Sequence, residues 1–158
     1  MRTIARNRSL HLIDVENLYA AHHEAPYEPW FGDLYWEVVG RGPTDLAIVG
    51  ADRSHALEID AVFPGARKLW GFGPDGADRQ LLDAVDWPAL ERGCSTLVIA
   101  SGDGCFVDAA YRARQRDIRV VVVSRAESLS AYLASYADVV IEFPEFDPGA
   151  PPEFVTAA

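Results

Sequence analysis

Residues 95–104 read STLVIASGDG and carry the strongest structural signal in the chain. The first six residues form a nearly continuous apolar run, which is typical of a strand buried on both faces of a parallel sheet. Asp103 follows between two glycines, and residues 106–116 then favour a helix. A buried strand that leads through an acidic turn into a helix predicts an α/β domain, in which the functional crevice lies where the strands end.

Strand and helix patterns alternate along the rest of the chain. Strands are predicted at residues 9–13, 44–49, 67–72, 118–123 and 138–143, and helices at residues 30–39, 56–63, 77–86 and 129–135. The helix from residue 77 is expected to continue past Pro88 to residue 91, and the charged strand at residues 67–72 to lie at a sheet edge. This order predicts an α/β three-layer sandwich with a mainly parallel sheet of five or six strands.

Length, charge and cysteine content narrow the classes of function. The 158 residues fit one domain, predicted at residues 1–143, with an extended or disordered proline-rich tail at residues 144–158. The net charge of −10 argues against a general nucleic-acid coat protein, but not against an RNA enzyme whose acidic residues surround a metal.

Hydrophobicity and cysteine content also predict the cellular location of the protein. No apolar run approaches the roughly 20 residues of a membrane span, and no signal peptide is evident. Cys94 and Cys105 fit neither a disulfide framework nor a zinc site. We therefore expect a cytoplasmic protein without membrane association.

Acidic side chains follow several of the predicted strands. The residues at these positions are Asp14, Asp52, Asp78 and Asp103. Because the carboxyl ends of parallel strands meet at one edge, these carboxylates are expected to converge there. Clustered carboxylates repel each other unless a cation or a proton intervenes, and hard oxygen ligands suit Mg²⁺ or Mn²⁺. The pattern therefore favours metal-assisted phosphodiester chemistry.

Three of these aspartates, Asp14, Asp78 and Asp103, also have a purely structural interpretation. Asp14 and Asp103 stand where a helix N-cap is expected, and Asp78 lies in a first helical turn, where acids complement the helix dipole. The convergence of all three at one edge favours the metal-binding interpretation. Asp83 lies five positions after Asp78, so it points in a different direction from the same helix.

Three further residues are candidates for substrate binding. Asn17 either positions water or phosphate or bonds local backbone, and Ser101 either positions a ligand or caps the next helix. Arg112 belongs to a group of arginines that forms either an RNA backbone track or a solvated helix face: Arg112, Arg114, Arg116, Arg119 and Arg125. His11, inside a strand, is more typical of a core or edge residue than of a catalytic base.

Three segments resemble the motifs of NYN domains, a branch of the PIN-like nuclease superfamily. They are LIDVEN at residues 12–17, GADRQLLD at residues 76–83 and LVIASGDGCF at residues 97–106, the last being the most specific. The similarity extends over roughly residues 10–143, nearly the whole predicted domain. The resemblance implies a PIN-like strand order of 3-2-1-4-5 and a metal-dependent ribonuclease.

The resemblance also implies roles for individual residues. Asp14, Asp78 and Asp103 would be the catalytic and metal-binding residues, with Mg²⁺ or Mn²⁺ as the cofactor, and Asn17 a polar neighbour. One position departs from the family, because NYN proteins usually carry a second aspartate where this chain has Cys105. Either Asp83 or Asp108 compensates, or metal binding and activity are reduced or lost.

Three hypotheses of function follow. The first is a metal-dependent ribonuclease that acts on single-stranded RNA, and the second is a weak or inactive NYN-type module that binds RNA or a protein partner. A receiver-like phosphoacceptor domain ranks below both, because it needs a lysine after its last strand and the single lysine is Lys68. A homodimer is compatible with the sequence, which identifies no protein partner.

Overall fold

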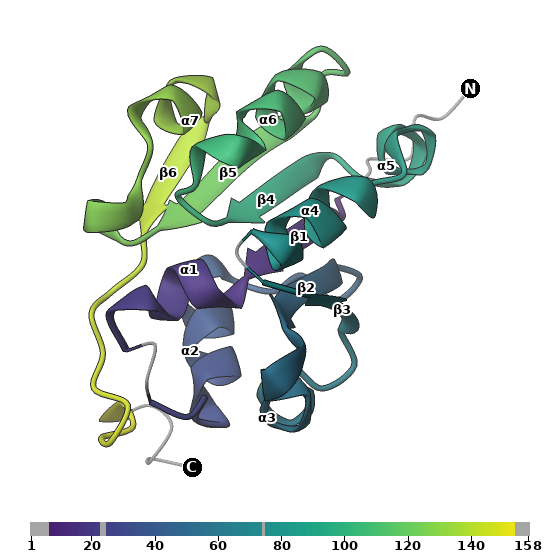
Figure 1. The fold of residues 1–158 in the computed structure, drawn as a ribbon. Coiled ribbons are helices and arrows are strands. Elements are labelled where there is room, and N and C mark those ends of the chain that lie inside the picture. Colours follow the sequence, from purple (N-terminus) through teal and green to yellow (C-terminus); the bar gives the residue numbers. More distant parts are fainter. Residues whose placement is uncertain (1–6, 23–24, 74, 154–158) are drawn as a thin grey trace.

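The architecture is a six-stranded sheet with helices on both faces (Figure 1). The computed structural model describes residues 7–22, 25–73 and 75–153. The strands are β1 Ser9–Asp14, β2 Leu46–Asp52, β3 Arg67–Gly71, β4 Thr96–Ala100, β5 Arg119–Ser124 and β6 Val139–Glu142. The helices are α1 Val15–Tyr19, α2 Trp30–Val39, α3 Ala56–Val62, α4 Gly76–Asp83, α5 Trp87–Gly93, α6 Val107–Arg114 and α7 Ala131–Tyr136. Four 3₁₀ turns are Ala20–His22, Arg53–His55, Gly104–Phe106 and Ala126–Ser128.

The strand order is β3-β2-β1-β4-β5-β6, and every neighbouring pair is parallel. The predicted parallel α/β class and the PIN-like order are confirmed: β3 lies at one edge, as expected, and β6 is added beside β5 at the other. At the centre, Leu12 of β1 lies in register between Ile48 of β2 and Ile99 of β4. The chain reverses its direction of travel across the sheet between β1 and β4, and ligands bind at such switch points in open α/β sheets.

Two apolar cores cover the two faces of the sheet because side chains alternate along each strand. One face carries Ile13, Val49 and Val98, and it packs against α1, α2 and α3. The other carries Leu12 and Ile99 and packs against α4, α5, α6 and α7. These two cores give the predicted three layers, and Figure 1 shows the helices on their respective sides.

The predicted helix over residues 77–91 is in fact two helices. α4 ends at Asp83, and α5 begins at Trp87. The side chain of Asp86 accepts a hydrogen bond from the backbone N–H of Ala89 at 3.0 Å and so caps α5. Pro88 lies in the first turn of α5, where its missing N–H is tolerated, but it cannot continue an unbroken helix. The expected continuation was therefore wrong.

The second strand lies further along the chain than residues 44–49. β2 begins at Leu46 and ends at Asp52. The Asp45 carboxylate accepts hydrogen bonds from the backbone N–H groups of Ser9 at 3.0 Å and Gly42 at 2.9 Å. These bonds hold the preceding residues in a turn, which delays the start of the strand.

The segment after β6 packs against the first layer of helices. Phe143 is buried, and the ring centroid of Phe146 lies 4.9 Å from that of Tyr19 and 5.9 Å from that of Trp30. In Figure 1 this yellow segment runs from β6 past α1. The division of the domain at residue 143 stays a prediction. No helix within the described ranges is long and apolar enough to cross a membrane.

Candidate metal-binding site

Asp14 lies at the carboxyl end of β1, at the switch point. It is 3% exposed, and its Oδ1 accepts a bond of 3.4 Å from the backbone N–H of Asn17 as the N-cap of α1. The Ser101 hydroxyl donates to its Oδ2 at 2.8 Å. The cap predicted for Asp14 is therefore present, and the same carboxylate also faces the edge of the sheet.

The turn after β4 brings Asp103 to the same edge. The backbone N–H of Asp103 donates to Ser101 Oγ at 3.2 Å, and its own Oδ1 accepts from the N–H of Cys105 at 2.8 Å. A Cβ on Gly102 would lie 2.3 Å from Ser124 Oγ, so only glycine fits this turn. The Gly102 N–H donates to Asn17 Oδ1 at 2.9 Å. Asn17 therefore ties α1 to the β4 turn rather than bonding only its own segment.

Asp78 reaches the edge because α4 begins directly against the end of β3. A Cβ on Gly71 would lie 2.1 Å from the backbone nitrogen of Ala77, so the two backbones pack without an intervening side chain. This close approach places Asp78, which is 8% exposed, beside the strand ends.

The three predicted acids line one cavity of about 220 Å³. Among the residues that the structure describes, the lining is Asp14, Glu16, Asn17, Asp75, Ala77, Asp78 and Asp103. Glu16 and Asp75 were not predicted as members of the site. A sequence signal existed for Glu16, which lies two residues after Asp14 within the first NYN-like motif. Asp75 had none, because its position depends on a left-handed conformation (φ 60°) just before α4.

The carboxylates in the cavity perturb one another. Burial raises the pKa of Asp14 well above its ordinary value, and the neighbouring Asp78 carboxylate raises it further. Burial also raises the pKa of Asp78, although the hydrogen bond with Asp14 acts in the opposite direction. These raised pKa values mean that the protein groups around the cavity do not fully stabilise its ionised carboxylates. Binding of a proton or a cation is therefore favoured there.

Cys105 lies inside this cluster. Its sulfur lies within 4.8 Å of a carboxylate oxygen of Asp78 and of one of Asp103, and these two oxygens also lie within that distance of each other. Cys105 is an exposed residue, but desolvation of its thiol by its surroundings, with the Asp78 and Asp103 carboxylates nearby, raises the thiol pKa, so that it stays protonated at neutral pH in the metal-free protein. A neutral thiol adds no anionic ligand for a hard cation. The carboxylate oxygens present fit a hard divalent cation, for which Asp14, Asp78 and Asp103, as lining residues, are the candidate donors, and a neutral thiol at Cys105 would weaken such a set.

The acids proposed to compensate for Cys105 do not line the cavity. Asp108 is exposed on α6 and forms an ion pair with Arg112 at 3.0 Å. Asp83 is exposed at the end of α4. Asp52, the fourth strand-end acid, lines a neighbouring cavity instead, and its backbone N–H donates to Glu16 Oε1 at 3.1 Å.

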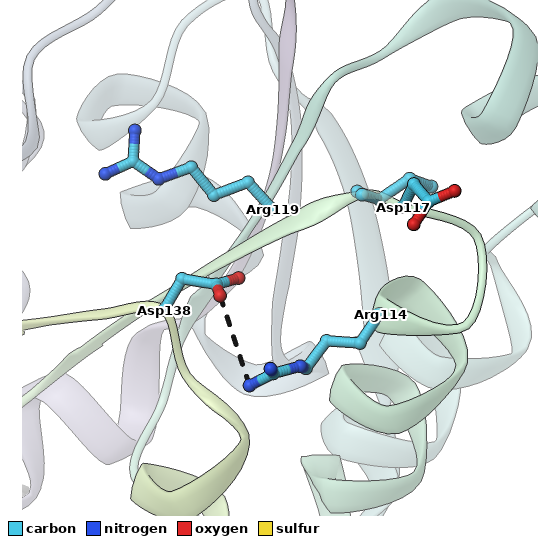
Figure 2. A pocket seen from close by; sticks show the side chains of 5 residues that line it. Arg114, Asp117, Arg119 and Asp138 are labelled. Carbon is cyan, nitrogen blue, oxygen red and sulfur yellow. Dashed lines mark ion pairs between the residues drawn. The ribbon is translucent and has the colours of Figure 1, made fainter.

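The predicted group of arginines is divided among three places. Arg112 and Arg116 lie over the ring of Trp87, with guanidinium-to-centroid distances of 6.0 Å and 5.1 Å. Arg114 and Arg119 border a separate hollow of about 390 Å³, where Arg114 is 4.0 Å from Asp138 (Figure 2). That hollow lies at the amino end of β5, opposite to the acidic cavity.

Arg125, at the other end of β5, contacts a residue of the site but borders a different hollow and pairs with Glu127 at 3.3 Å. Its Nε donates to the backbone oxygen of Asn17 at 3.2 Å. Arg112 does not line the acidic cavity, and its role in RNA binding stays a prediction.

The strand order and the acidic cavity at its switch point define a class, that of α/β domains with a PIN-like nuclease fold. The chain belongs to the NYN domain family, whose model matches residues 10–144. A crystal structure of a protein of unknown function from Vibrio parahaemolyticus is similar, with a TM-score of 0.69 and 19% identity over 92% of this chain and 98% of that chain. At this identity the likeness shows a shared fold. No curated protein matches the chain.

Proposed function

We propose that the protein is a metal-dependent ribonuclease that cleaves phosphodiester bonds of single-stranded RNA. The observation that carries the proposal is the convergence of Asp14, Asp78 and Asp103 on one cavity, from three remote segments of the chain. NYN domains typically act on RNA, and nucleases of this fold generally depend on divalent metals, which agrees with the surplus of negative charge in the cavity.

In this proposal Asp14, Asp78 and Asp103 hold Mg²⁺ or Mn²⁺. When bound, such an ion lowers the pKa of water and stabilises charge on phosphoryl oxygens. Ser101 orients the Asp14 carboxylate through its 2.8 Å hydrogen bond, and so acts as a positioning residue. Asn17 lines the cavity while its side-chain oxygen holds the β4 turn, which fixes the distance between the ends of β1 and β4.

A single strand suits the cavity better than a duplex. The cavity lies between the start of α1, the start of α4 and the turn after β4. A phosphate group enters such a recess only from a backbone that can bend toward it, which an unpaired strand does more easily than an A-form helix. Arg125 holds the backbone oxygen of Asn17 at 3.2 Å beside this recess, while its guanidinium pairs with Glu127 at 3.3 Å.

The test is cleavage of labelled single-stranded RNA by Asp103→Asn. Asparagine retains an oxygen that can cap the turn, so the fold is expected to persist while an anionic ligand is lost. We expect a loss of at least about 100-fold in cleavage rate with Mg²⁺ or Mn²⁺. Asp33→Asn, on the exposed side of α2, is the matched control and should retain wild-type activity. Full activity of Asp103→Asn would remove Asp103 from the mechanism.

A catalytically weak or inactive NYN-type module that binds RNA or a protein partner is the second candidate. The observation in its favour is the neutral Cys105 thiol within 4.8 Å of the Asp78 and Asp103 ligand atoms. Calorimetric titration with Mn²⁺ separates the candidates when combined with the cleavage assay. The module would bind Mn²⁺ weakly and cut no RNA with any divalent metal.

A further inference from the structure

A second cavity adjoins the acidic one. Its volume is about 570 Å³, within the range of roughly 300–1,000 Å³ that small-molecule sites usually have. The lining is Glu16, Tyr19, Ala20, Tyr27, Asp52, Ser54, His55 and Gly73. Glu16 borders both cavities, so a ligand that spans them passes this residue.

One side of this cavity is aromatic and firmly held. The ring centroid of Tyr27 lies 4.7 Å from that of Tyr19 and 4.8 Å from that of His55, both in edge-to-face geometry. Glu58 Oε2 accepts from the Tyr27 backbone N–H at 2.9 Å and lies 3.3 Å from His55 Nδ1. Tyr19 is 1% and Tyr27 8% exposed, so the cluster offers little ring surface, but what a flat ring in the cavity does contact is already fixed and loses little conformational entropy.

The other side presents hydrogen-bond acceptors. Asp52 Oδ1 accepts from the Ser54 backbone N–H at 2.9 Å and from the Ser54 hydroxyl at 2.7 Å, which orients the carboxylate. Those bonds also lower the pKa of Asp52, so the carboxylate is ionised at neutral pH. Glu16 adds a second carboxylate, held through its Oε1 by the Asp52 backbone. Both anions disfavour a phosphate in this cavity and favour a neutral group that carries N–H donors.

We propose that this cavity binds a nucleobase of the RNA strand whose phosphate lies in the acidic cavity, and that it selects bases with an exocyclic amino group over uracil. This inference rests on the proposed ribonuclease function. Unpaired bases are recognised by contact with aromatic side chains and by hydrogen bonds to their edges, and carboxylates accept from amino groups such as cytosine N4. Adenine, cytosine and guanine each carry such a donor. Uracil has no amino group: its N3–H donor lies between two carbonyl oxygens, which the carboxylates would repel.

Two measurements test the selection independently of one another. The first is fluorescence polarisation of labelled oligo(C), oligo(A) and oligo(U) with the full chain in Ca²⁺. The second is mapping of cut positions on a mixed-sequence RNA in Mn²⁺. We expect oligo(C) and oligo(A) to bind about tenfold more tightly than oligo(U), since one well-made base-edge contact gives discrimination of that order, and we expect few cuts beside uracil.

Asp52→Asn is the decisive variant. Asparagine retains an oxygen for Ser54 and adds an amide donor that can reach a uracil carbonyl, so the ratio of oligo(C) to oligo(U) affinity should fall by about tenfold. Asp60→Asn is the matched control, because Asp60 lies outside both cavities and pairs with Lys68 at 3.4 Å. The control should leave the ratio unchanged.

The outcomes separate the two proposals. RNA that is cut without base dependence, or an RNA-cleaving protein whose affinity ratio Asp52→Asn leaves unchanged, overturns the nucleobase assignment and leaves the ribonuclease proposal standing. Base-selective binding without cleavage supports the assignment and overturns the nuclease activity. A protein that neither binds nor cuts any RNA overturns both.

Discussion

Asp14 serves two purposes that place opposite demands on its charge. As the cap of α1 it needs only a side-chain oxygen, which a neutral amide also supplies. As a metal ligand it must be ionised, although burial and Asp78 favour its protonated form. The ionised carboxylate that metal binding requires at Asp14 therefore lowers the stability of the metal-free protein.

We expect Asp14→Asn to stabilise the metal-free protein by about 1 kcal/mol or more at pH 7. The folded-state pKa of Asp14 is raised, so wild-type stability falls as the pH rises from the unfolded-state pKa through the folded-state pKa, and the cost is complete above it. Urea unfolding in EDTA at several pH values measures the difference between the two proteins. It should shrink as the pH approaches about 4, and a difference independent of pH would contradict the argument.

The second prediction concerns Cys105, where a carboxylate is added instead of removed. Cys105→Asp would add an anionic oxygen next to Asp78 and Asp103, so Mn²⁺ affinity should rise by roughly tenfold and cleavage should increase. Cys105→Ser is the matched control, because it removes the sulfur without adding charge and should leave the affinity low. Calorimetry with Mn²⁺ gives the affinities. Equal affinities in the aspartate and serine variants would exclude this position from the metal site.

At the scale of elements, the site depends on how closely α4 approaches the sheet. Gly71 allows the backbone of α4 to contact the backbone of β3, and this contact brings Asp78 to the cavity. The helical conformation of α4 determines only the direction in which the Asp78 side chain points. The position of the carboxylate is set by packing between two elements.

Gly71→Ala should therefore damage both stability and metal binding. The new Cβ would meet backbone atoms of α4 that cannot move alone, and overpacking of this kind costs about 1–3 kcal/mol. Displacement of α4 should also weaken Mn²⁺ binding. Urea unfolding and Mn²⁺ titration measure the two effects. Gly93→Ala is the control, because a Cβ there meets nothing within 4 Å and should leave both quantities near wild type.

At the scale of the molecule, a buried polar network joins β1, α2 and the turn before β2. His11 is 1% exposed, with Nδ1 2.8 Å from the Tyr35 hydroxyl and Nε2 3.0 Å from Asp45 Oδ2. Burial lowers the pKa of His11, and the opposing attraction of Asp45 does not reverse this. The histidine is thus a neutral core residue, in agreement with the sequence-based expectation.

This network makes stability depend on pH. Because the folded-state pKa of His11 lies below the unfolded value of about 6.5, the unfolded chain takes up a proton first as the pH falls, and the native state loses stability below about pH 6.5. His11→Gln should lack this loss. Urea unfolding of both proteins between about pH 7.5 and 5 measures it. Parallel pH profiles would show that His11 does not titrate in this way.

Much of the architecture could be predicted, and the reasons are local. Apolar runs such as residues 95–100 and helical stripes are properties of a few consecutive residues, so they can be recognised without the tertiary structure. The gathering of Asp14, Asp78 and Asp103 followed from one general rule about the ends of parallel strands. The break between α4 and α5 was missed because the Asp86 cap outweighs a continuing apolar stripe.

The parallel α/β class and the acids at its edge could be derived from the amino-acid sequence, because these depend on periodicity and strand order. Which other side chains share the site depends on how distant segments pack. Asp75 enters through a left-handed turn, Asp52 faces a second cavity, and Arg119 and Arg125 lie at opposite ends of β5. The physical reason is that the direction of a side chain depends on packing between segments distant in the chain, which no local pattern encodes.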